Sequence, residues 1–264
     1  MKILLIGDVV GRGGRKALNH LAPALRLEFG CDFVIANGEN MAGGKGMNNK
    51  TLNDLAPANL DVITSGDHIW DQRQFMDEIK AHDHILRPAN LHSDLPGKGW
   101  GIYTTASGLK VGVINLLGRV FMAHHSDCPF QAADKILIEL RKKTNLIFVD
   151  FHAEATSEKI AMGRFLDGRV SCVFGTHTHV QTADATIFQG GTAYITDLGM
   201  VGSSESILGR KIAPVVQKFS TGIPKYFEVE NKNILLCGAV VELDDSTGQA
   251  ISIQAIQRKF EDED

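Results

Sequence analysis

Short runs of aliphatic and β-branched residues recur along this 264-residue chain, and they constrain its fold more than any other feature. Each run is closed by Gly, Asn, Asp or His, as expected of buried strands that end in turns. Segments with helical periodicity lie between several of these runs, so the first two thirds of the chain alternate strand and helix. The predicted strands are Lys2–Ile6, Asp32–Ala36, Asp61–Thr64, Val111–Leu116, Asn145–Phe151 and Val170–Phe174, and the predicted helices are Arg15–Glu28, Gln72–Lys80, Gln131–Lys142 and Ser157–Leu166.

The pattern changes after about residue 184, where strand-like segments follow one another and are joined by turn-forming residues. These segments are Ala185–Phe188, Ala193–Thr196, Lys225–Val229, Ile234–Leu243 and Ala250–Gln257. We expect them to form an antiparallel meander, and we expect Glu261–Asp264 to form a solvated acidic end. No Pro- or Ser-rich linker and no internal repeat divides the sequence. Residues 1–264 are therefore predicted to form one α/β domain with two stacked sheets and helices outside them.

The composition narrows the classes of partner and the cellular location. Hydrophobic residues make up 44% of the chain, which is enough for a sizeable core, and the formal net charge is -4. Without a basic excess, no stable complex with nucleic acid is expected, and the partners should be small molecules. The apolar runs fall far short of the ~20 residues that a membrane-spanning helix needs. With no secretory signal and no CxxC pair among four scattered cysteines, we expect reduced thiols and a cytoplasmic protein.

Carboxylate, amide and imidazole side chains follow the ends of several predicted strands. They are Asp8, Glu39, Asn40, Asp67, His68, His152, His177 and His179. Ligands of open α/β sheets gather beyond the carboxyl ends of the strands, so these side chains are expected to converge on one rim. Several charges buried together are costly unless a cation compensates them. Oxygen and imidazole ligands without a thiolate are typical of Mn, Fe, Zn and similar first-row ions.

Each of these residues also has a simpler interpretation when it is taken alone. An Asp after a strand, such as Asp8, usually caps a helix or a turn, and a single His152 is more often a hydrogen-bonded buried imidazole than a metal ligand. The pair His177 and His179 is more informative, because imidazoles two residues apart face the same way on an extended segment. The prediction of a metal site therefore depends on the joint pattern.

A series of motifs runs in order along almost the whole chain. They are Gly7-Asp8-Val9-Val10-Gly11, Asn37-Gly38-Glu39-Asn40, Ser65-Gly66-Asp67-His68, Asn115-Leu116-Leu117-Gly118-Arg119, Asp127-Cys128-Pro129-Phe130, Asp150-Phe151-His152-Ala153-Glu154, Gly175-Thr176-His177-Thr178-His179 and Thr196-Asp197-Leu198-Gly199-Met200. Together they resemble the calcineurin-like metallophosphoesterases, in particular the bacterial YmdB-like branch of 2',3'-cyclic-nucleotide phosphodiesterases.

The resemblance implies a four-layer αββα sandwich with two transition-metal ions, iron or manganese, at the edge of the sheets. It implies hydrolysis of small phosphodiesters such as 2',3'-cyclic AMP. Residue by residue, it assigns Asp8, Glu39 and His179 to one metal, and Glu39 as a bridge with Asp67, His152 and His177 to the other. It also places His68 beside the phosphate as a catalytic imidazole that binds no metal, and Asn40 in contact with the site.

The chain departs from the wider superfamily at two motif positions. Val10 stands where that superfamily has a metal-binding His, so the first metal should have fewer protein ligands. Asp67 replaces the usual Asn, which gives three negative ligands, Asp8, Glu39 and Asp67, against the four positive charges of two divalent ions. A less positive site should hold metal more tightly but attract phosphate less strongly. A metal-binding regulator with weak or no catalysis on the same fold therefore stays open as an alternative.

Several further residues are weaker candidates. Lys45, in a glycine-rich loop, is a candidate for binding the substrate's phosphate or ribose, and Arg119, after a predicted strand, for binding an anion or making a structural ion pair. His124-His125 and His82-x-His84 lack the strand-end context, and we expect them to lie outside the site. The segment Gly11–Lys16 suggests a phosphate-binding loop, but it fits neither common nucleotide-binding motif, so a Rossmann-type module is disfavoured. Association into a homo-oligomer is left open.

Overall fold

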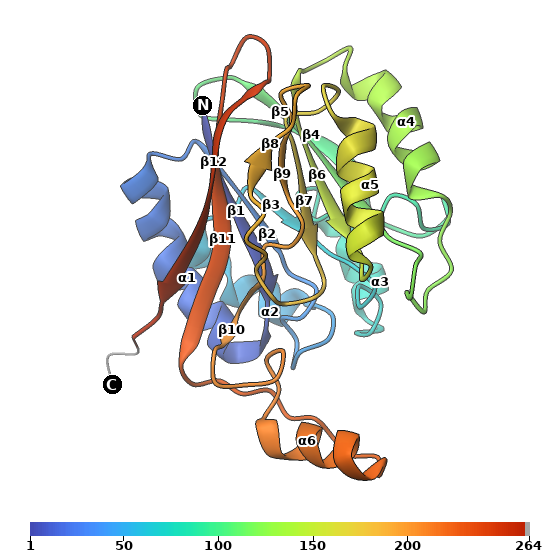
Figure 1. Cartoon of the computed structure of the whole chain (residues 1–264), viewed down its shortest axis with the longest axis vertical. Coiled ribbons are helices and arrows are strands. Elements are labelled where there is room, and N and C mark those ends of the chain that lie inside the picture. The colour runs from blue at the N-terminus through green and yellow to red at the C-terminus, as the bar shows by residue number, and fades with distance from the viewer. Residues whose placement is uncertain (262–264) are drawn as a thin grey trace.

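The computed structural model describes residues 1–261, which form two six-stranded sheets packed face to face (Figure 1). The first sheet has the order β12 (Ala250–Lys259), β11 (Ile234–Leu243), β10 (Met200–Ser203), β1 (Lys2–Val9), β2 (Phe33–Asn37) and β3 (Val62–Thr64). The second has the order β4 (Trp100–Thr104), β5 (Lys110–Leu117), β6 (Leu146–His152), β7 (Cys172–Thr176), β9 (Ala193–Ile195) and β8 (Thr186–Ile187).

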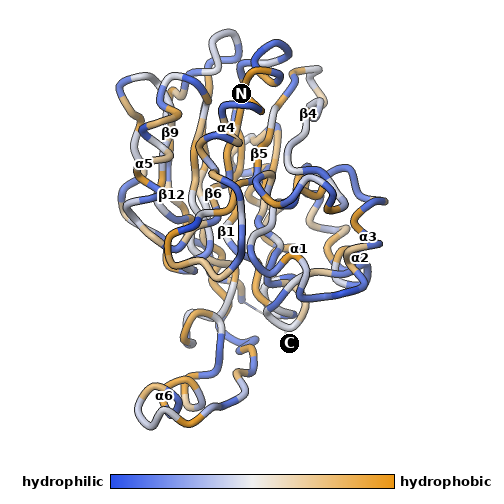
Figure 2. The backbone as a smooth tube through the Cα atoms, turned by 90° about the vertical axis from the view of Figure 1, so that its right-hand side faces the viewer, coloured by the Kyte–Doolittle hydropathy of each residue, from blue (hydrophilic) through white to orange (hydrophobic). Residues whose placement is uncertain are grey.

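Most of the helices cover the outer faces of the two sheets. They are α1 (Gly11–Phe29), α2 (Asn49–Asp54), α3 (Phe75–Glu78), α4 (Pro129–Leu140), α5 (Thr156–Leu166) and α6 (Ile212–Thr221), with 3-10 turns at Ala56–Ala58 and Ile79–Ala81. Helix α1 packs on the first sheet, and α4 and α5 pack on the second (Figure 1). Helix α6 is different, because it projects beyond the layered body (Figures 1 and 2).

Three hydrophobic cores fill the spaces between four layers. Alternate residues of β1 show how the sequence builds them: Leu4 and Ile6 face α1, whereas Ile3 and Leu5 face the second sheet. A third core lies between the second sheet and its helices, with Leu137 of α4 among its buried residues. Because both faces of both sheets are covered, the strands have continuous apolar sequences rather than an alternation of apolar and polar residues. The arrangement is the predicted four-layer αββα sandwich.

The central strands of each sheet run parallel, which brings their carboxyl ends to one rim. Strand β1 pairs in parallel with β2 and β10, and β2 pairs in parallel with β3. Strand β6 likewise pairs in parallel with β5 and β7. The polar residues that follow these strands therefore meet at the same edge of the sandwich.

The C-terminal tail differs from the predicted meander. Its strands are divided between the two sheets: β8 and β9 belong to the second and β10, β11 and β12 to the first. Strand β9 pairs in parallel with β7, and β10 in parallel with β1, so only part of the tail is antiparallel. The predicted strand Lys225–Val229 is wrong, because this segment makes a single bridge, between Val229 and Arg210, and lies outside both sheets.

Other differences are smaller. Helix α1 begins at Gly11, earlier than expected, and the predicted helix Gln72–Lys80 is a short α-helix followed by a 3-10 turn. The four cysteine thiols are free. Among the helices of residues 1–261, none is long and apolar enough to cross a membrane. Of the predicted acidic end, Glu261 is exposed, and residues 262–264 lie outside the described part of the chain.

Candidate metal centre

The two sheets contribute different chemistry to the shared rim. Asp8 is the penultimate residue of β1, Glu39 follows β2, and Asp67 follows β3, so the first sheet supplies carboxylates. His152 ends β6, and the turn after β7 carries the remaining two histidines, so the second sheet supplies imidazoles. The rim therefore brings together residues that are far apart in the sequence.

Four of these side chains form a tight cluster. Glu39, Asp67, His152 and His177 each offer one ligand atom, and these atoms all lie within 4.8 Å of one another. Nε2 of His152 is 3.1 Å from both Oε1 of Glu39 and Oδ1 of Asp67. Nδ1 of His177 is 3.0 Å from Nε2 of His152 and 3.5 Å from Oδ1 of Asp67. The two rings meet edge to face, with centroids 4.8 Å apart.

A buried hydrogen-bond chain sets the tautomer of His152. The Thr176 hydroxyl donates to Oδ1 of Asp150 at 2.7 Å, so its oxygen is free to accept from Nδ1–H of His152 at 2.9 Å. Asp150 also accepts from Nδ2 of Asn37 at 3.1 Å and from the Thr64 hydroxyl. With its proton on Nδ1, the ring presents the lone pair of Nε2 to the cluster.

His177 is oriented from its other side by a residue that sequence reasoning missed. Nε2 of His177 lies 3.1 Å from Oε2 of Glu154, a carboxylate that can only accept, so this nitrogen carries a proton. Nδ1 of His177 is then left with its lone pair facing His152 and Asp67. A carboxylate behind an imidazole is the common support of a metal-binding histidine. The position of Glu154, two residues after the end of β6, was the available signal in the sequence.

His179 lies beside the cluster and faces Asn40. Nδ1–H of His179 donates to the carbonyl of Leu208 at 3.2 Å, which directs Nε2 toward Oδ1 of Asn40 at 3.1 Å. Nδ2 of Asn40 donates to the carbonyl of Gly44 at 3.3 Å, which fixes this orientation of the amide. Two electron-pair donors therefore face each other, an arrangement that a cation between or beside them would stabilise.

Asp8 carries the clearest sign of a missing partner. Its Oδ2 accepts from the backbone N–H of His177 at 3.1 Å, but its Oδ1 is buried and accepts no hydrogen bond from the described residues. Gly66 packs directly against the side chains of Glu39 and His152. A Cβ added at this residue would lie 2.2 Å from Oε2 of Glu39 and 2.2 Å from Cδ2 of His152. Only glycine lets the chain pass this close to them.

The turn that carries the two histidines has a strained backbone. His177 has φ = 99° and His179 has φ = 66°, values that residues other than glycine rarely adopt. Asp197 holds this turn, because its Oδ2 accepts from the backbone N–H of Thr178 at 3.1 Å. The same oxygen pairs with the buried ammonium of Lys159 at 2.6 Å. These contacts hold the backbone of the turn in its strained conformation.

The electrostatics of the cluster favour a positive charge at its centre. Burial holds the pKa of Asp8 well above its usual value; the charge of His152 opposes this, and the neighbouring Glu39 adds to it. Burial alone would lower the pKa of His152, yet Glu39, Asp67 and Asp8 together raise it well above its usual value. Carboxylates that draw a proton onto an imidazole in this way create a site that suits a divalent cation. The donor atoms therefore fit a metal ion.

The predicted catalytic imidazole lies next to the cluster. The backbone N–H of His68 donates to Oε2 of Glu39 at 3.3 Å, and Nδ1 of His68 lies 3.1 Å from Oδ2 of Asp71. His124, which we expected outside the site, has its Nδ1 3.9 Å from Oδ2 of Asp67. No strand end in the sequence marks His124, because a long loop carries it back to the rim.

A cavity of about 360 Å³ opens beside the cluster, and Glu39, Asn40, His68, His177 and His179 line it. Sequence reasoning missed the residues that complete its wall, which include Glu154, Arg210, Val215, Phe219 and Phe227.

The two weaker substrate-binding candidates do not line this cavity. Nζ of Lys45 points to Asp71, at 4.0 Å from Oδ2. Arg119 is exposed, and its backbone N–H donates to Oε1 of Glu158 at 3.0 Å.

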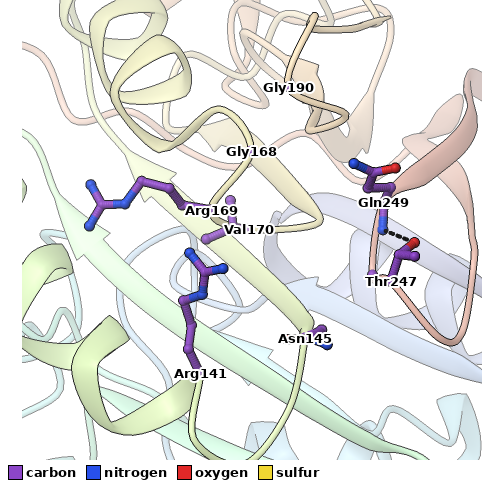
Figure 3. A pocket seen from close by; sticks show the side chains of 9 residues that line it. Arg141, Asn145, Gly168, Arg169, Val170, Gly190, Thr247 and Gln249 are labelled. Carbon is purple, nitrogen blue, oxygen red and sulfur yellow. Dashed lines mark hydrogen bonds between the residues drawn. The ribbon is translucent and has the colours of Figure 1, made fainter.

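A second pocket lies at the amino ends of β6 and β7, where Arg141, Arg169, Thr247 and Gln249 surround it (Figure 3). Its volume is about 40 Å³, far below the roughly 300 Å³ or more of ligand pockets. Arg169 is already paired with Oδ1 of Asp134 at 2.5 Å. Carboxylate and imidazole side chains of the metal-type cluster line the cavity at the carboxyl ends, and this lining makes it the candidate active site.

Comparisons with known proteins agree with this geometry. Residues 4–256 match the YmdB-like protein family. A 2',3'-cyclic-nucleotide 2'-phosphodiesterase of Bacillus subtilis (strain 168) is 46% identical over 256 residues, covering 97% of this chain and 96% of that protein. A putative phosphatase/phosphodiesterase of Mycoplasma genitalium is 36% identical over 269 residues, covering 100% of this chain and 95% of that protein.

Two solved structures have the same fold. A novel phosphatase from Mycoplasma pneumoniae superposes with a TM-score of 0.91 at 34% identity, covering 98% of this chain and 93% of that chain. A hypothetical protein from Thermus thermophilus superposes with a TM-score of 0.91 at 36% identity, covering 98% of this chain and 99% of that chain.

Proposed function

The chain belongs to the YmdB-like protein family, as its motifs suggested, and we propose that it is a metal-dependent phosphodiesterase acting on small phosphodiesters such as 2',3'-cyclic nucleotides. The observation that carries the proposal is the cluster of Glu39, Asp67, His152 and His177 beside a cavity of substrate size. The name of the Bacillus subtilis relative supports the substrate class.

The ligand assignment is the one that the resemblance to the calcineurin-like metallophosphoesterases implies, and the cluster of Glu39, Asp67, His152 and His177 supports its second half. Asp8, Glu39 and His179 are proposed to hold one divalent ion, and Glu39, Asp67, His152 and His177 a second, with iron or manganese preferred by these oxygen and nitrogen ligands. Two such ions supply Lewis acidity at the phosphate oxygens and acidify water near neutral pH.

His68 is proposed as the proton donor to the leaving oxygen. Its Nδ1–H is directed to Oδ2 of Asp71 at 3.1 Å, so Nε2 is the nitrogen available to the cavity. Protonated at Nε2, the ring can donate to the alkoxide as the ester bond breaks, and the contact with Asp71 holds the ring in place for this transfer. Asn40, which lines the same cavity, is proposed to contact the substrate as well.

Metal analysis and hydrolysis of 2',3'-cyclic AMP by the purified chain test this proposal. We expect close to two ions per chain and turnover that His68→Ala lowers about 100-fold or more, the usual contribution of general acid catalysis. His92→Ala is the matched control, because His92 also lies near an aspartate, Asp94, at 3.9 Å, on the exposed surface. Metal without any turnover would instead favour the alternative, a metal-binding regulator in which Asp67 weakens the chemistry.

The remaining expectations accompany this proposal. We propose that residues 1–264 act as one domain, which no observation above divides. The cytoplasmic location, the lack of a stable nucleic-acid complex and the capacity to form homo-oligomers stay predictions from the sequence. Lys45 and Arg119 stay candidates only for contacts outside the cavity described above.

A further inference from the structure

Residues 204–230, most of the connection between β10 and β11, form an arm that carries α6 away from the layered body (Figures 1 and 2). Its surface is unusually apolar for a projecting segment. The large hydrophobic side chains exposed on it are Leu208, Ile212, Val216, Phe219, Ile223 and Tyr226. Exposed aromatic and aliphatic groups gathered on one segment indicate a surface that contacts something else.

Part of this arm belongs to the cavity beside the candidate metal centre. Val215, Phe219 and Phe227 line the same space as Glu39 and His177. One region of the cavity is therefore charged and suited to a phosphate with its metals, and another region is apolar and aromatic. Ligand sites commonly combine an apolar wall with a few polar groups in this way.

Hydrogen bonds attach the arm to residues beside the candidate metal centre. The guanidinium of Arg210, which burial partly removes from water, donates to the carbonyls of Gly44 at 2.7 Å, Gly43 at 3.2 Å and Phe227 at 3.3 Å. Gly44 also accepts from the side chain of Asn40. At the start of the arm, the carbonyl of Leu208 accepts from Nδ1–H of His179. These bonds fix the aromatic wall relative to the groups that face the phosphate.

Phe219 is the residue of this wall that would bury the most apolar surface against a ligand. Its side chain lines the cavity, yet 79% of the residue is exposed. An aromatic ring left open to water on the lip of a binding cavity offers a face for a flat, weakly polar group. Stacking of this kind accepts any nucleobase, because every base has a π-face.

We propose that the arm is the base-binding wall of the active site, in which Phe219, with Phe227 and Val215, receives the nucleobase of a nucleotide phosphodiester. This inference rests on the proposed function and extends it from the phosphate to the rest of the substrate. It makes Phe219 a residue that determines specificity and leaves bond cleavage to the groups on the sheet rim.

Kinetics on two substrates test the inference. The substrates are 2',3'-cyclic AMP and the 2,3-cyclic phosphate of methyl ribofuranoside, which lacks the base. We expect Phe219→Ala to raise KM for the nucleotide about 10-fold or more, with little change in kcat and with unchanged kinetics on the base-free ester. Tyr226→Ala is the matched control, because Tyr226 is an aromatic residue of the same arm, 84% exposed, that does not line the cavity.

The outcomes separate this inference from the proposed function. Equal KM values of the wild-type protein for both substrates, or an equal effect of Phe219→Ala on both, would overturn the base-binding wall while leaving the phosphodiesterase intact. If the metal-loaded protein cleaves neither ester, the proposed function fails, and equilibrium titration with adenosine 3'-monophosphate and ribose 3-phosphate decides the inference instead. Tighter binding of the nucleotide that Phe219→Ala removes would support it, and equal binding of the two ligands would refute it.

Discussion

Replacing Lys159 with methionine is expected to destabilise the protein strongly, because it breaks an ion pair buried behind the candidate metal centre. Lys159 and Asp197 are each about 1% exposed, and their charged atoms are 2.6 Å apart. The ammonium also donates to the carbonyl of Thr176 at 2.7 Å, at the end of β7. Methionine keeps the length and apolar volume of lysine but supplies neither the charge nor the donors.

The expected loss in free energy of unfolding comes from the carboxylate of Asp197, which stays buried without its partner. Asp197 keeps the N–H groups of Thr178 at 3.1 Å and Gly199 at 2.8 Å, but it loses its counter-charge in a site that water does not reach. Removing one partner of a buried pair typically costs about 3–5 kcal/mol. With a urea m-value of about 3 kcal/mol/M, this loss lowers the unfolding midpoint by about 1–2 M.

Urea unfolding of the wild-type and variant proteins measures this effect. Both are treated with EDTA, because a bound metal would add its own stabilisation to the folded state. Circular dichroism and tryptophan fluorescence should give coincident transitions. Lys142→Met is the matched control: Lys142, just after α4, pairs with Glu139 at 2.8 Å on the exposed surface, and its loss should leave the midpoint unchanged.

Two results would refute the reasoning. A Lys159→Met midpoint within about 0.3 M of wild type would mean that the pair contributes no more than an exposed one. The double variant Lys159→Met with Asp197→Asn should recover part of the lost stability, because it removes the unpaired charge as well. If the double variant lost as much free energy of unfolding as the two single variants together, the unpaired carboxylate would not be the cause.

Four further predictions concern the metal itself. Asp67→Asn removes one of three carboxylates, so metal affinity measured by calorimetry should fall and turnover should change; unchanged values for both would contradict the charge argument. Glu154→Ala removes the support of His177 and should weaken metal binding about 10- to 100-fold, whereas unchanged affinity would make Glu154 a surface residue only. Gly66→Ala pushes a Cβ against Glu39, and a variant with full metal content would show that the rim has more room than its contacts indicate. Chelation should lower the thermal midpoint and re-addition of metal should restore it, and an identical midpoint in both states would argue against a bound ion.

The central sheets and the candidate site could be predicted because both depend on local patterns. Apolar runs such as Lys2–Ile6 were long enough to be recognised as strands, and a polar residue directly after each run marked the rim. Parallel neighbours then place those residues together without any knowledge of the loops. The chemistry of the site is therefore readable from residues such as Asp8 and His152, whose positions follow from the strand that carries them.

The C-terminal tail could not be predicted in the same way. Turn signals indicated that strands followed one another, but they do not tell which sheet each strand joins. The chain crosses from the second sheet at Ile195 to the first at Met200, and both β9 and β10 join parallel neighbours. Such choices are made by long-range packing of apolar faces, which leaves no local mark.

The arm was the largest gap between sequence and structure. Helix α6 contains Pro214 in its first turn and Val215-Val216 next to it, so intrinsic propensities argue weakly for a helix there. The alternation in Lys225–Val229 resembles a strand, but no neighbouring strand reaches it. Arg210, which fixes the arm, bonds to carbonyls of Gly43 and Gly44 much earlier in the chain, a contact that no spacing rule reveals.

The buried carboxylates of the rim show what structure adds to a list of acidic residues. Asp150 and Asp197 are as close to strand ends in the sequence as Asp8 and Asp67 are, so sequence alone gives no reason to separate them. In the structure Asp150 accepts hydrogen bonds from neutral donors, including Thr176, and Asp197 is neutralised by a lysine.

The candidate ligands have a different environment. Oδ1 of Asp8 accepts no hydrogen bond from residues 1–261, and Oδ1 of Asp67 faces imidazole nitrogens of His152 and His177 whose rings carry their protons on the opposite nitrogen. A buried oxygen without a protein donor costs free energy that some other group has to offset. The residues whose oxygens lack such donors are therefore the ones that a metal ion would complete, whereas Asp150 and Asp197 hold the histidines in place.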